Sequence, residues 1–211
     1  MKHLSTICGL LCLISISCTN DLDVTPINPQ QTMDYNQDAL FNKIYASFCL
    51  TGQVGPAGNG DVPGDEGQSE FFRMLWYLNE FTTDEAHWVW ATDAGVPDLL
   101  HNNYGESNPF SSGMYYRLYF TITLCNFFLE QATSTDAATL LQRAEVRFIR
   151  ALNYYNIMDL YGNAAFTTRV SAEVPIRYTR MQFFNFVEEE LKAIESELAM
   201  PGSNSDGRVD R

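Results

Sequence analysis

The sequence predicts an all-α fold of tetratricopeptide-like helical hairpins joined by long irregular loops. Apolar residues recur at helical spacing over 111–132 and again over 136–160. Only three or four residues separate these two segments, so they are expected to fold back on each other as an αα-hairpin. Ala144, Phe148 and Ala151 have the small–large–small spacing that lets the second helix of a tetratricopeptide unit approach its neighbour closely.

Residues 1–17 have the features of a lipoprotein signal peptide. A short basic start precedes an apolar run over 4–17 that ends in small residues, and Cys18 follows directly. The apolar run is too short to span a bilayer comfortably. A cysteine in this position is the bacterial lipoprotein arrangement, in which lipid on the thiol and amine anchors the protein to a membrane. The alternative is an ordinary signal peptide with Cys18 there by chance.

Composition limits the classes of ligand. The chain has 26 acidic and 13 basic side chains and a formal net charge of -13, which disfavours nucleic acid as a partner and leaves neutral ligands such as sugars open. Cys49 and Cys125 lie in apolar helical patterns, and we expect buried free thiols rather than a disulfide bond. No metal-ligand spacing occurs, and no cofactor is predicted.

The elements follow in order after Cys18. Residues 18–35 read as a tether and extended lead-in, and a first helix is expected over 36–50. Residues 52–67 are rich in glycine and proline, which predicts a mobile loop rather than regular structure. The expected apolar side of the first helix is Leu40, Ile44, Ala46 and Phe48.

The later helices have clearer signals. The segment 111–132 carries a line of aromatic residues with Thr123 at helical spacing: Tyr116, Tyr119, Phe120, Thr123 and Phe127. The segment 136–160 carries an expected apolar stripe, with the nearby charged residues Arg143, Glu145, Arg147 and Arg150 largely off it: Leu140, Leu141, Ala144, Phe148, Ala151, Leu152 and Tyr155. Thr179 and Gln182 form a capping box for a last helix, whose inward residues are Phe183, Val187, Leu191, Ile194 and Leu198. Gly162 and the pair Pro201-Gly202 end the helices before them.

Several runs resemble the SusD/RagB family in order and spacing. They are 18–26 (CTNDLDVTP), 82–85 (TTDE), 143–155 (RAEVRFIRALNYY) and 159–162 (DLYG), and the run from 143 to 162 is specific to that family. The resemblance covers essentially the whole chain and looks nearest to the starch-binding member. Because family members are far longer than 211 residues, we expect 36–211 to be the N-terminal part of a truncated SusD-like domain.

The resemblance implies a function. Family members are non-catalytic surface lipoproteins that bind glycans and form a lid on a TonB-dependent outer-membrane transporter. The expected partners are therefore a starch-type oligosaccharide or polysaccharide, a SusC-like transporter barrel, and the outer membrane through the lipid on Cys18. The second half of the binding site, and any calcium site there, are expected outside this chain.

A carbohydrate site needs aromatic faces for the sugar ring and polar groups at its edge. The run 85–90 (EAHWVW) is the best candidate from the residues alone. By the resemblance, Trp88 falls on a stacking aromatic residue, Arg73 on an arginine that binds hydroxyl groups, and Asp93 on a position where the starch-binding member has asparagine. The alternatives to sugar binding are purely structural: core packing for Trp88 and Trp90, and a surface ion pair for Arg73.

Other chemistries lack their patterns. The glycine-rich loop has no Lys-Ser/Thr ending for phosphate, and Asp61, Asp65 and Glu66 do not have calcium-loop spacing. Asp84 and Glu85 are adjacent, and adjacent residues rarely face one glycosidic bond from opposite sides as that chemistry requires. Two alternatives to glycan binding stay open: a helical scaffold that docks the transporter without touching glycan, and a glycosidase. Trp76 is expected in the core.

Overall fold

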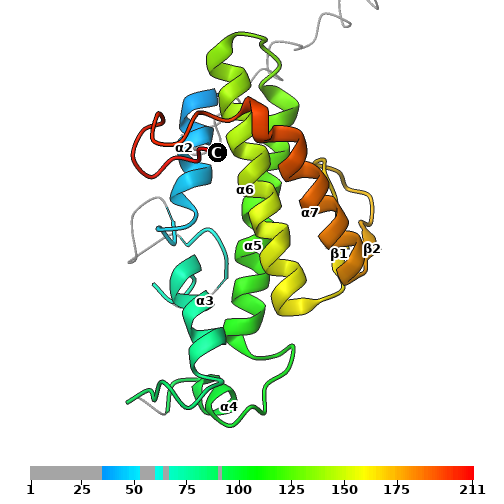
Figure 1. Ribbon diagram of the computed structural model, residues 1–211. Helices are drawn as coiled ribbons and strands as arrows, with labels where there is room; N and C mark the ends of the chain where they lie inside the picture. The colour runs from blue at the N-terminus through cyan, green and yellow to red at the C-terminus, as the bar shows by residue number, and fades with distance from the viewer. Residues whose placement is uncertain (1–34, 53–59, 64–66, 90–91) are drawn as a thin grey trace, which may run out of the picture. The chain divides into compact units, whose positions relative to one another are not determined.

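Two long helices form the centre of the unit Asn36–Arg211 (Figure 1). The computed structural model describes residues 35–52, 60–63, 67–89 and 92–211. The predicted signal peptide, Cys18, nearly all of the tether, much of the glycine-rich loop and Trp90 lie outside these residues. Within the described ranges, no helix is both long enough and apolar enough to cross a membrane.

The central pair is the predicted hairpin. α5 (Pro109–Gln131) starts at the N-cap Asn108, and α6 (Ala137–Tyr161) starts at the N-cap Asp136, whose carboxylate accepts a hydrogen bond from the backbone N–H of Thr139 at 2.9 Å. Early residues of α5 share a core with late residues of α6, while late α5 residues share one with early α6 residues. The two helices are therefore antiparallel, as the short connection predicts.

Among the residues that the structure describes, three shorter helices precede this pair. α2 (Gln37–Ala46) buries Phe41 and Ile44 against α5 and α6. α3 (Phe71–Glu80) buries one face against α5, and α4 (Val96–Leu100) follows it after a turn-rich segment. α2 ends about one turn before the end of the helix predicted over 36–50, and α3 and α4 are helices that the periodicity analysis did not identify.

The chain then adds a hairpin and a last helix. β1 (Ala164–Phe166) pairs antiparallel with β2 (Ile176–Tyr178), so that Ala165 lies opposite Arg177. α7 (Arg180–Ile194) starts with the predicted Thr179–Gln182 capping box and continues into a short 3-10 helix, η1 (Glu195–Glu197). Gly162 ends α6 with a positive φ of 72°, as predicted. The all-α prediction is confirmed, and the described part of the chain adds one two-stranded sheet.

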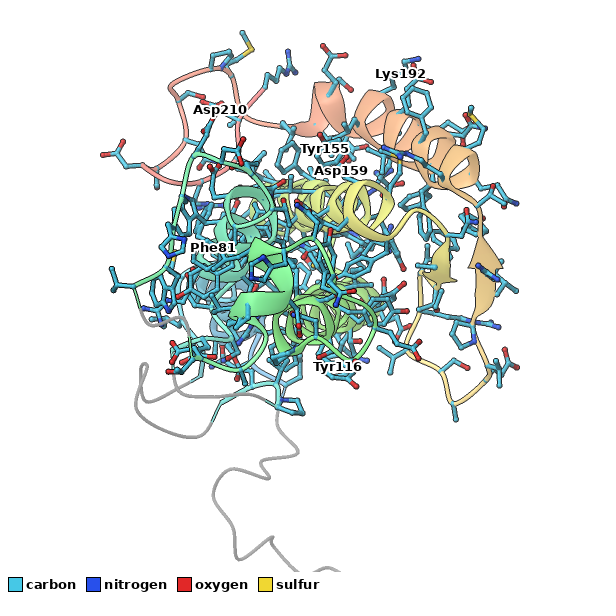
Figure 2. All side chains as sticks on the ribbon, turned by 90° about the horizontal axis from the view of Figure 1, so that it is seen from below. Phe81, Tyr116, Tyr155, Asp159, Lys192 and Asp210 are labelled. Carbon is cyan, nitrogen blue, oxygen red and sulfur yellow. The ribbon has the colours of Figure 1, made fainter. Side chains whose placement is uncertain are left out.

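The exposed faces differ from the predicted ones. Much of the predicted aromatic line of α5 is exposed, because α5 packs instead through Phe110, Met114, Leu118 and Ile122. On α6 the predicted stripe is wrong at both ends, where Leu140 and Tyr155 are exposed. Glu145 and Arg150 were expected off the stripe but are buried, because α6 is covered on more than one side. Figure 2 shows α6 between α5 and α7.

The two described cysteines are free, as expected. Cys125 is fully buried in the core of α5, and burial raises the pKa of its thiol to about 12. Cys49 is exposed, so the expectation that it is buried is wrong. It lies just after α2, in a turn where the helical pattern no longer determines which side faces the core.

Candidate functional site

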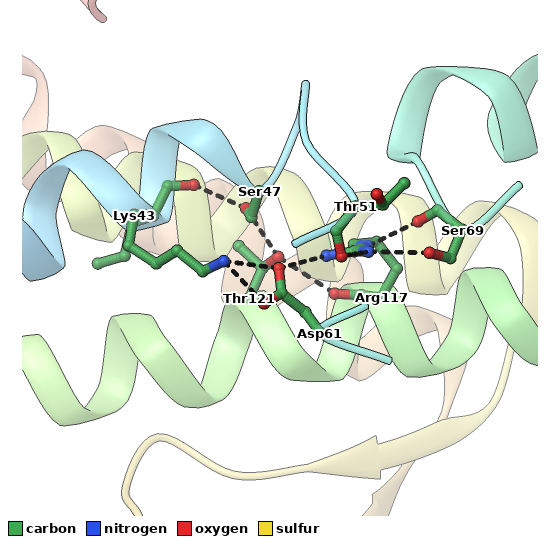
Figure 3. A network of polar contacts seen from close by, with 8 residues as sticks. Lys43, Ser47, Thr51, Asp61, Ser69, Arg117 and Thr121 are labelled. Carbon is green, nitrogen blue, oxygen red and sulfur yellow. Dashed lines mark hydrogen bonds and ion pairs between the residues drawn. The ribbon is translucent and has the colours of Figure 1, made fainter. Parts of the chain in front are cut away.

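A buried arginine fixes the segment that leads into α3 (Figure 3). Arg117 of α5 is fully buried, and its guanidinium donates to the carbonyl oxygens of Ser69 at 2.8 Å and Thr51 at 3.1 Å. It also donates to the carboxylate of Asp61 at 3.2 Å, which Lys43 contacts at 2.7 Å. Burial lowers the pKa of Arg117, while Asp61 opposes this shift by favouring the charged form. The two ends of the glycine-rich loop are thereby held against α5.

α3 then carries the aromatic residues of the candidate site. Its N-cap Glu70 accepts hydrogen bonds from the backbone N–H groups of Phe72 and Arg73 at 3.0 and 2.7 Å, which starts the helix. One helical turn further on, Tyr77 is buried on the face toward α5, where its ring meets Phe110 at 4.9 Å between centroids. The helix therefore presents Arg73 and Tyr77 on neighbouring positions of one side.

Trp88 packs onto this aromatic group. Its ring lies 5.4 Å from that of Tyr77 and 5.5 Å from that of Phe81, measured between centroids, in edge-on and tilted arrangements. Trp88 is half-buried: its indole packs against the core, and part of its surface stays open. It lies in a segment without regular structure between α3 and α4.

Asp93 holds the indole in place. The indole Nε1–H of Trp88 donates to Oδ2 of Asp93 at 3.0 Å. Asp93 is itself half-buried, and its charge also reaches the hydroxyl of Tyr77. The structure thus brings together two of the predicted site residues, which are five positions apart in the sequence.

Arg73 lies close enough to this aromatic group for its charge to act on Tyr77. Burial raises the pKa of Tyr77, and the charge of Arg73 lowers it while that of Asp93 raises it. The Tyr77 hydroxyl therefore lies within electrostatic reach of both predicted polar residues. Arg73 is exposed and lines a small hollow with Cys49 and Glu70. Among the described residues, none forms an ion pair with it.

The other two tryptophans of the sequence are Trp76 and Trp90. Trp90 lies outside the described residues. Trp76 was expected in the core, but 45% of its surface is exposed. Its ring meets those of Phe81 and Tyr77 in T-shaped contacts that leave much of it open to solvent. Tyr77 was not identified from the sequence. The signal for it is the four-residue spacing from Arg73, which becomes visible only once 71–80 is recognised as a helix.

An apolar hollow lies away from Trp88. An apolar groove of about 630 Å³ runs between α2, α3, α6 and the C-terminal residues, and its lining includes Phe48, Phe72, Leu152, Tyr155 and Val209. Its walls offer few hydrogen-bond partners, so it does not suit a hydroxyl-rich ligand. Within the part of the chain that the structure describes, no cluster of three or more potential metal ligands occurs.

The sequence is 40% identical over 197 residues to the starch-binding protein SusD of Bacteroides thetaiotaomicron. The chain is SusD-like. The match covers 92% of this chain, which confirms the resemblance to the SusD/RagB family. The chain spans only 36% of the length of SusD, about a third of that curated relative. No family model matches the sequence.

Solved structures share the fold of this SusD-like chain. A SusD-like protein from Bacteroides fragilis aligns with a TM-score of 0.60 at 18% identity, over 82% of this chain and 31% of its own. The surface glycan-binding protein A of Bacteroides uniformis aligns with a TM-score of 0.62 at 20% identity, over 81% of this chain and 37% of its own. That of Bacteroides fluxus aligns at 0.64 and 13% identity, over 83% of this chain and 36% of its own. At these identities the likeness shows the fold alone.

Proposed function

We propose that this chain is part of a non-catalytic surface lipoprotein that binds starch-type glycans and delivers them to a TonB-dependent outer-membrane transporter. The observation that carries the proposal is the supported indole of Trp88, held by Asp93 and backed by Tyr77. The 40% identity to a starch-binding protein supports the same ligand class. Lipid on Cys18 is the proposed anchor.

The geometry suits a sugar ring. An indole that is fixed at its N–H and packed against two other rings keeps its orientation, so stacking a pyranose on it costs little ordering. Asp93 has a second oxygen that accepts hydrogen bonds from hydroxyl groups, and Arg73 offers donors one helical turn from Tyr77. Trp90 belongs to the same proposed site through its position in the run 85–90.

Weak binding suits delivery. Stacking on one or two aromatic rings with a few hydrogen bonds corresponds to micromolar to millimolar dissociation constants, or roughly 4 to 8 kcal/mol. Such a complex dissociates readily, so the glycan passes to a transporter rather than staying on the lid. No residue of the proposed site has the paired arrangement that glycoside hydrolysis needs.

The test is calorimetric titration of the full-length mature protein with maltoheptaose. Trp88→Ala should weaken binding at least tenfold, because it removes both the stacking face and the partner of Asp93. Trp88→Phe should lie in between, because it keeps an aromatic face but loses the indole N–H. Tyr155→Ala is the matched control, since Tyr155 is an exposed aromatic residue in the separate apolar groove.

The outcomes separate the alternatives. Unchanged affinity in a folded Trp88→Ala protein would refute the site assignment. A protein that binds the transporter but no glycan would favour the scaffold alternative. Release of shorter sugars from maltoheptaose would favour a glycosidase.

A further inference from the structure

A second hollow lies beside the N-terminal turns of α5, on a different side of this helix from the Trp88 site. It has a volume of about 440 Å³, within the range of small-ligand sites. It is lined by the first two turns of α5, the last residue of α6, the loop before α5 and the residue before β1. The lining includes Glu106, Ser112, Tyr115, Tyr116, Tyr161 and Asn163.

Tyrosine rings form its walls. The rings of Tyr115 and Tyr161 meet at 5.2 Å between centroids and 89°, so they form two perpendicular faces. Tyr161 is fixed there because its hydroxyl donates to the carbonyl oxygen of Ser111 at 2.7 Å. Tyr116 is 51% exposed and forms the outer wall, on the outer side of α5 in Figure 2. The hollow therefore offers a fixed aromatic corner and an accessible ring.

Polar atoms stand at the edges of these rings. Asn163 accepts a hydrogen bond from the backbone N–H of Arg180 through Oδ1 at 2.9 Å, and no described residue accepts one from its Nδ2. Ser112 donates its hydroxyl proton to the carbonyl oxygen of Asn108 at 3.1 Å, which leaves the oxygen as an acceptor. Glu106 adds a carboxylate. Donors and acceptors are both present, as a ligand rich in hydroxyl groups requires.

The charged groups in the lining limit the classes of ligand that this hollow can bind. Its one ionisable carboxylate is not balanced by a cationic side chain in the lining, so an anionic ligand is disfavoured. A quaternary ammonium ion would bind against the tyrosine faces. It could not, however, accept a hydrogen bond from Nδ2 of Asn163 or donate one to the hydroxyl oxygen of Ser112. A neutral carbohydrate uses all three kinds of group.

The hollow is separate from the Trp88 site. Phe110 is buried at the inner side of the first turn of α5, where its ring contacts Tyr77 below Trp88. Ser112 lies two residues later, about 200° around the helix axis. Two sugar-binding surfaces on different sides of one helix end are suited to different stretches of one polysaccharide.

We propose that this hollow is a second carbohydrate-binding site, which takes a neutral sugar unit against Tyr116 and the corner formed by Tyr115 and Tyr161. It rests on the proposed function for its ligand class but not for its residues. Two weak sites on one chain raise the apparent affinity for a polysaccharide above that for a short oligosaccharide, because the second binding event becomes intramolecular.

The test uses the full-length mature protein and maltoheptaose as probe. In the Trp88→Ala background, saturable heat should persist, and adding Tyr116→Ala should abolish it. Asn163→Asp should weaken it at least threefold, because the acid keeps the acceptor for Arg180 but loses the Nδ2 donor. Tyr155→Ala, at 47% exposure, is the matched control and should leave it unchanged. Pullulan in a native gel should retard the double variant Trp88→Ala/Tyr116→Ala less than either single variant.

Each result of these experiments supports or overturns the second site. A Trp88→Ala protein that is folded and gives no heat overturns the second site and leaves the proposed function intact. Binding that Tyr116→Ala abolishes and Trp88→Ala does not affect supports the second site and refutes the Trp88 assignment. Tyr116-dependent binding of choline without binding of maltoheptaose overturns the ligand class. If Tyr116→Ala does not fold, Asn163→Asp alone decides, and unchanged heat in that variant overturns the proposal.

Discussion

Arg143 and Ala144 open the sequence run that is most specific to the family, and both support the scaffold. Arg143 donates to the carbonyl oxygens of Leu129 at 2.8 Å and Ala132 at 2.7 Å, which satisfies acceptors that the end of α5 leaves unpaired. Ala144 is fully buried, and its small side chain lets Ile194 of α7 pack close to α6. The tetratricopeptide-like spacing therefore has the packing role that the sequence suggests.

Glu145, the next residue, anchors the C-terminal segment. It is fully buried and accepts hydrogen bonds from Tyr45 of α2, from Asn204 at 3.2 Å and from Arg208 at 2.9 Å. Burial raises the pKa of Tyr45, with the hydrogen bond to Glu145 as the next cause. The charged residues of this run were predicted off the packed face because charge usually indicates solvent. Here hydrogen bonds from three donor residues stabilise the buried carboxylate of Glu145.

Trp88, Arg73 and Asp93 could be proposed from the sequence because the resemblance supplies their positions. Periodicity alone could not have placed them, since Trp88 and Asp93 lie in an irregular segment. Their hydrogen bond is a tertiary contact within a loop, which no helical or strand pattern signals. The support from Tyr77 was missed for the same reason, because it depends on how the loop folds back on α3.

Asp93 offers the sharpest test at a single residue. In Asp93→Asn the carboxamide oxygen still accepts from the indole of Trp88, and the new N–H₂ donates to a sugar hydroxyl, so the affinity for maltoheptaose should change less than fivefold. In Asp93→Ala the indole loses its partner, and the affinity should fall about tenfold. Calorimetry on the full-length protein measures both. Equal affinities for Asp93→Ala and the parent would show that the hydrogen bond does not position Trp88.

At the scale of elements, the long helices were predictable, and of the shorter helices only α2 was predicted. α5, α6 and α7 carry several turns of apolar periodicity and clear caps. α3 is only ten residues long and begins with aromatic residues on several sides, while α4 has five residues. Strands of three residues are too short for an alternating pattern to be recognised.

The faces of the helices were harder to predict than their existence. A single apolar stripe describes a helix that is packed on one side. α6 contacts α5, α7 and α2, so residues on several of its sides are buried. One of them is Arg150, which donates to Asn126 at 3.0 Å and to Glu190 at 3.0 Å. Polar residues that are paired in this way look like surface residues in the sequence.

The attachment of the loop to α5 gives a prediction for stability. Arg117→Met removes a buried guanidinium and leaves Asp61 and two carbonyl oxygens without this donor. The free energy of unfolding of the full-length protein should fall by about 3 to 5 kcal/mol, measured by urea denaturation.

The control for this prediction is another arginine. Arg169 pairs with Glu173 at 2.7 Å, but both side chains are mostly exposed, so Arg169→Met should change the stability by less than about 0.5 kcal/mol. If Arg117→Met is no more destabilising than Arg169→Met, the buried network does not hold the loop.

At the scale of the whole molecule, the described unit has surfaces of different chemistry. The Trp88 region and the tyrosine-lined hollow combine rings with polar atoms, which suits sugars. The groove between α2, α3 and α6 is almost wholly apolar and exposes Phe72 and Tyr155 to solvent. A patch of that kind on a protein surface marks a site of contact with other protein or a source of aggregation.

The segment Asn36–Arg211 produced by itself should therefore bind the apolar dye ANS and self-associate in a concentration-dependent way. The double substitution Phe72→Ser/Tyr155→Ser should lower the dye fluorescence at least twofold and shift the sedimentation profile toward the monomer, because it removes the two most exposed rings of the groove. Met181→Ser is the control, since Met181 is 66% exposed and lies outside the groove. If the double substitution and the Met181→Ser control change dye binding equally, the surface that binds the dye lies outside the groove. A response confined to Phe72 and Tyr155 would identify the groove as the surface through which this segment self-associates.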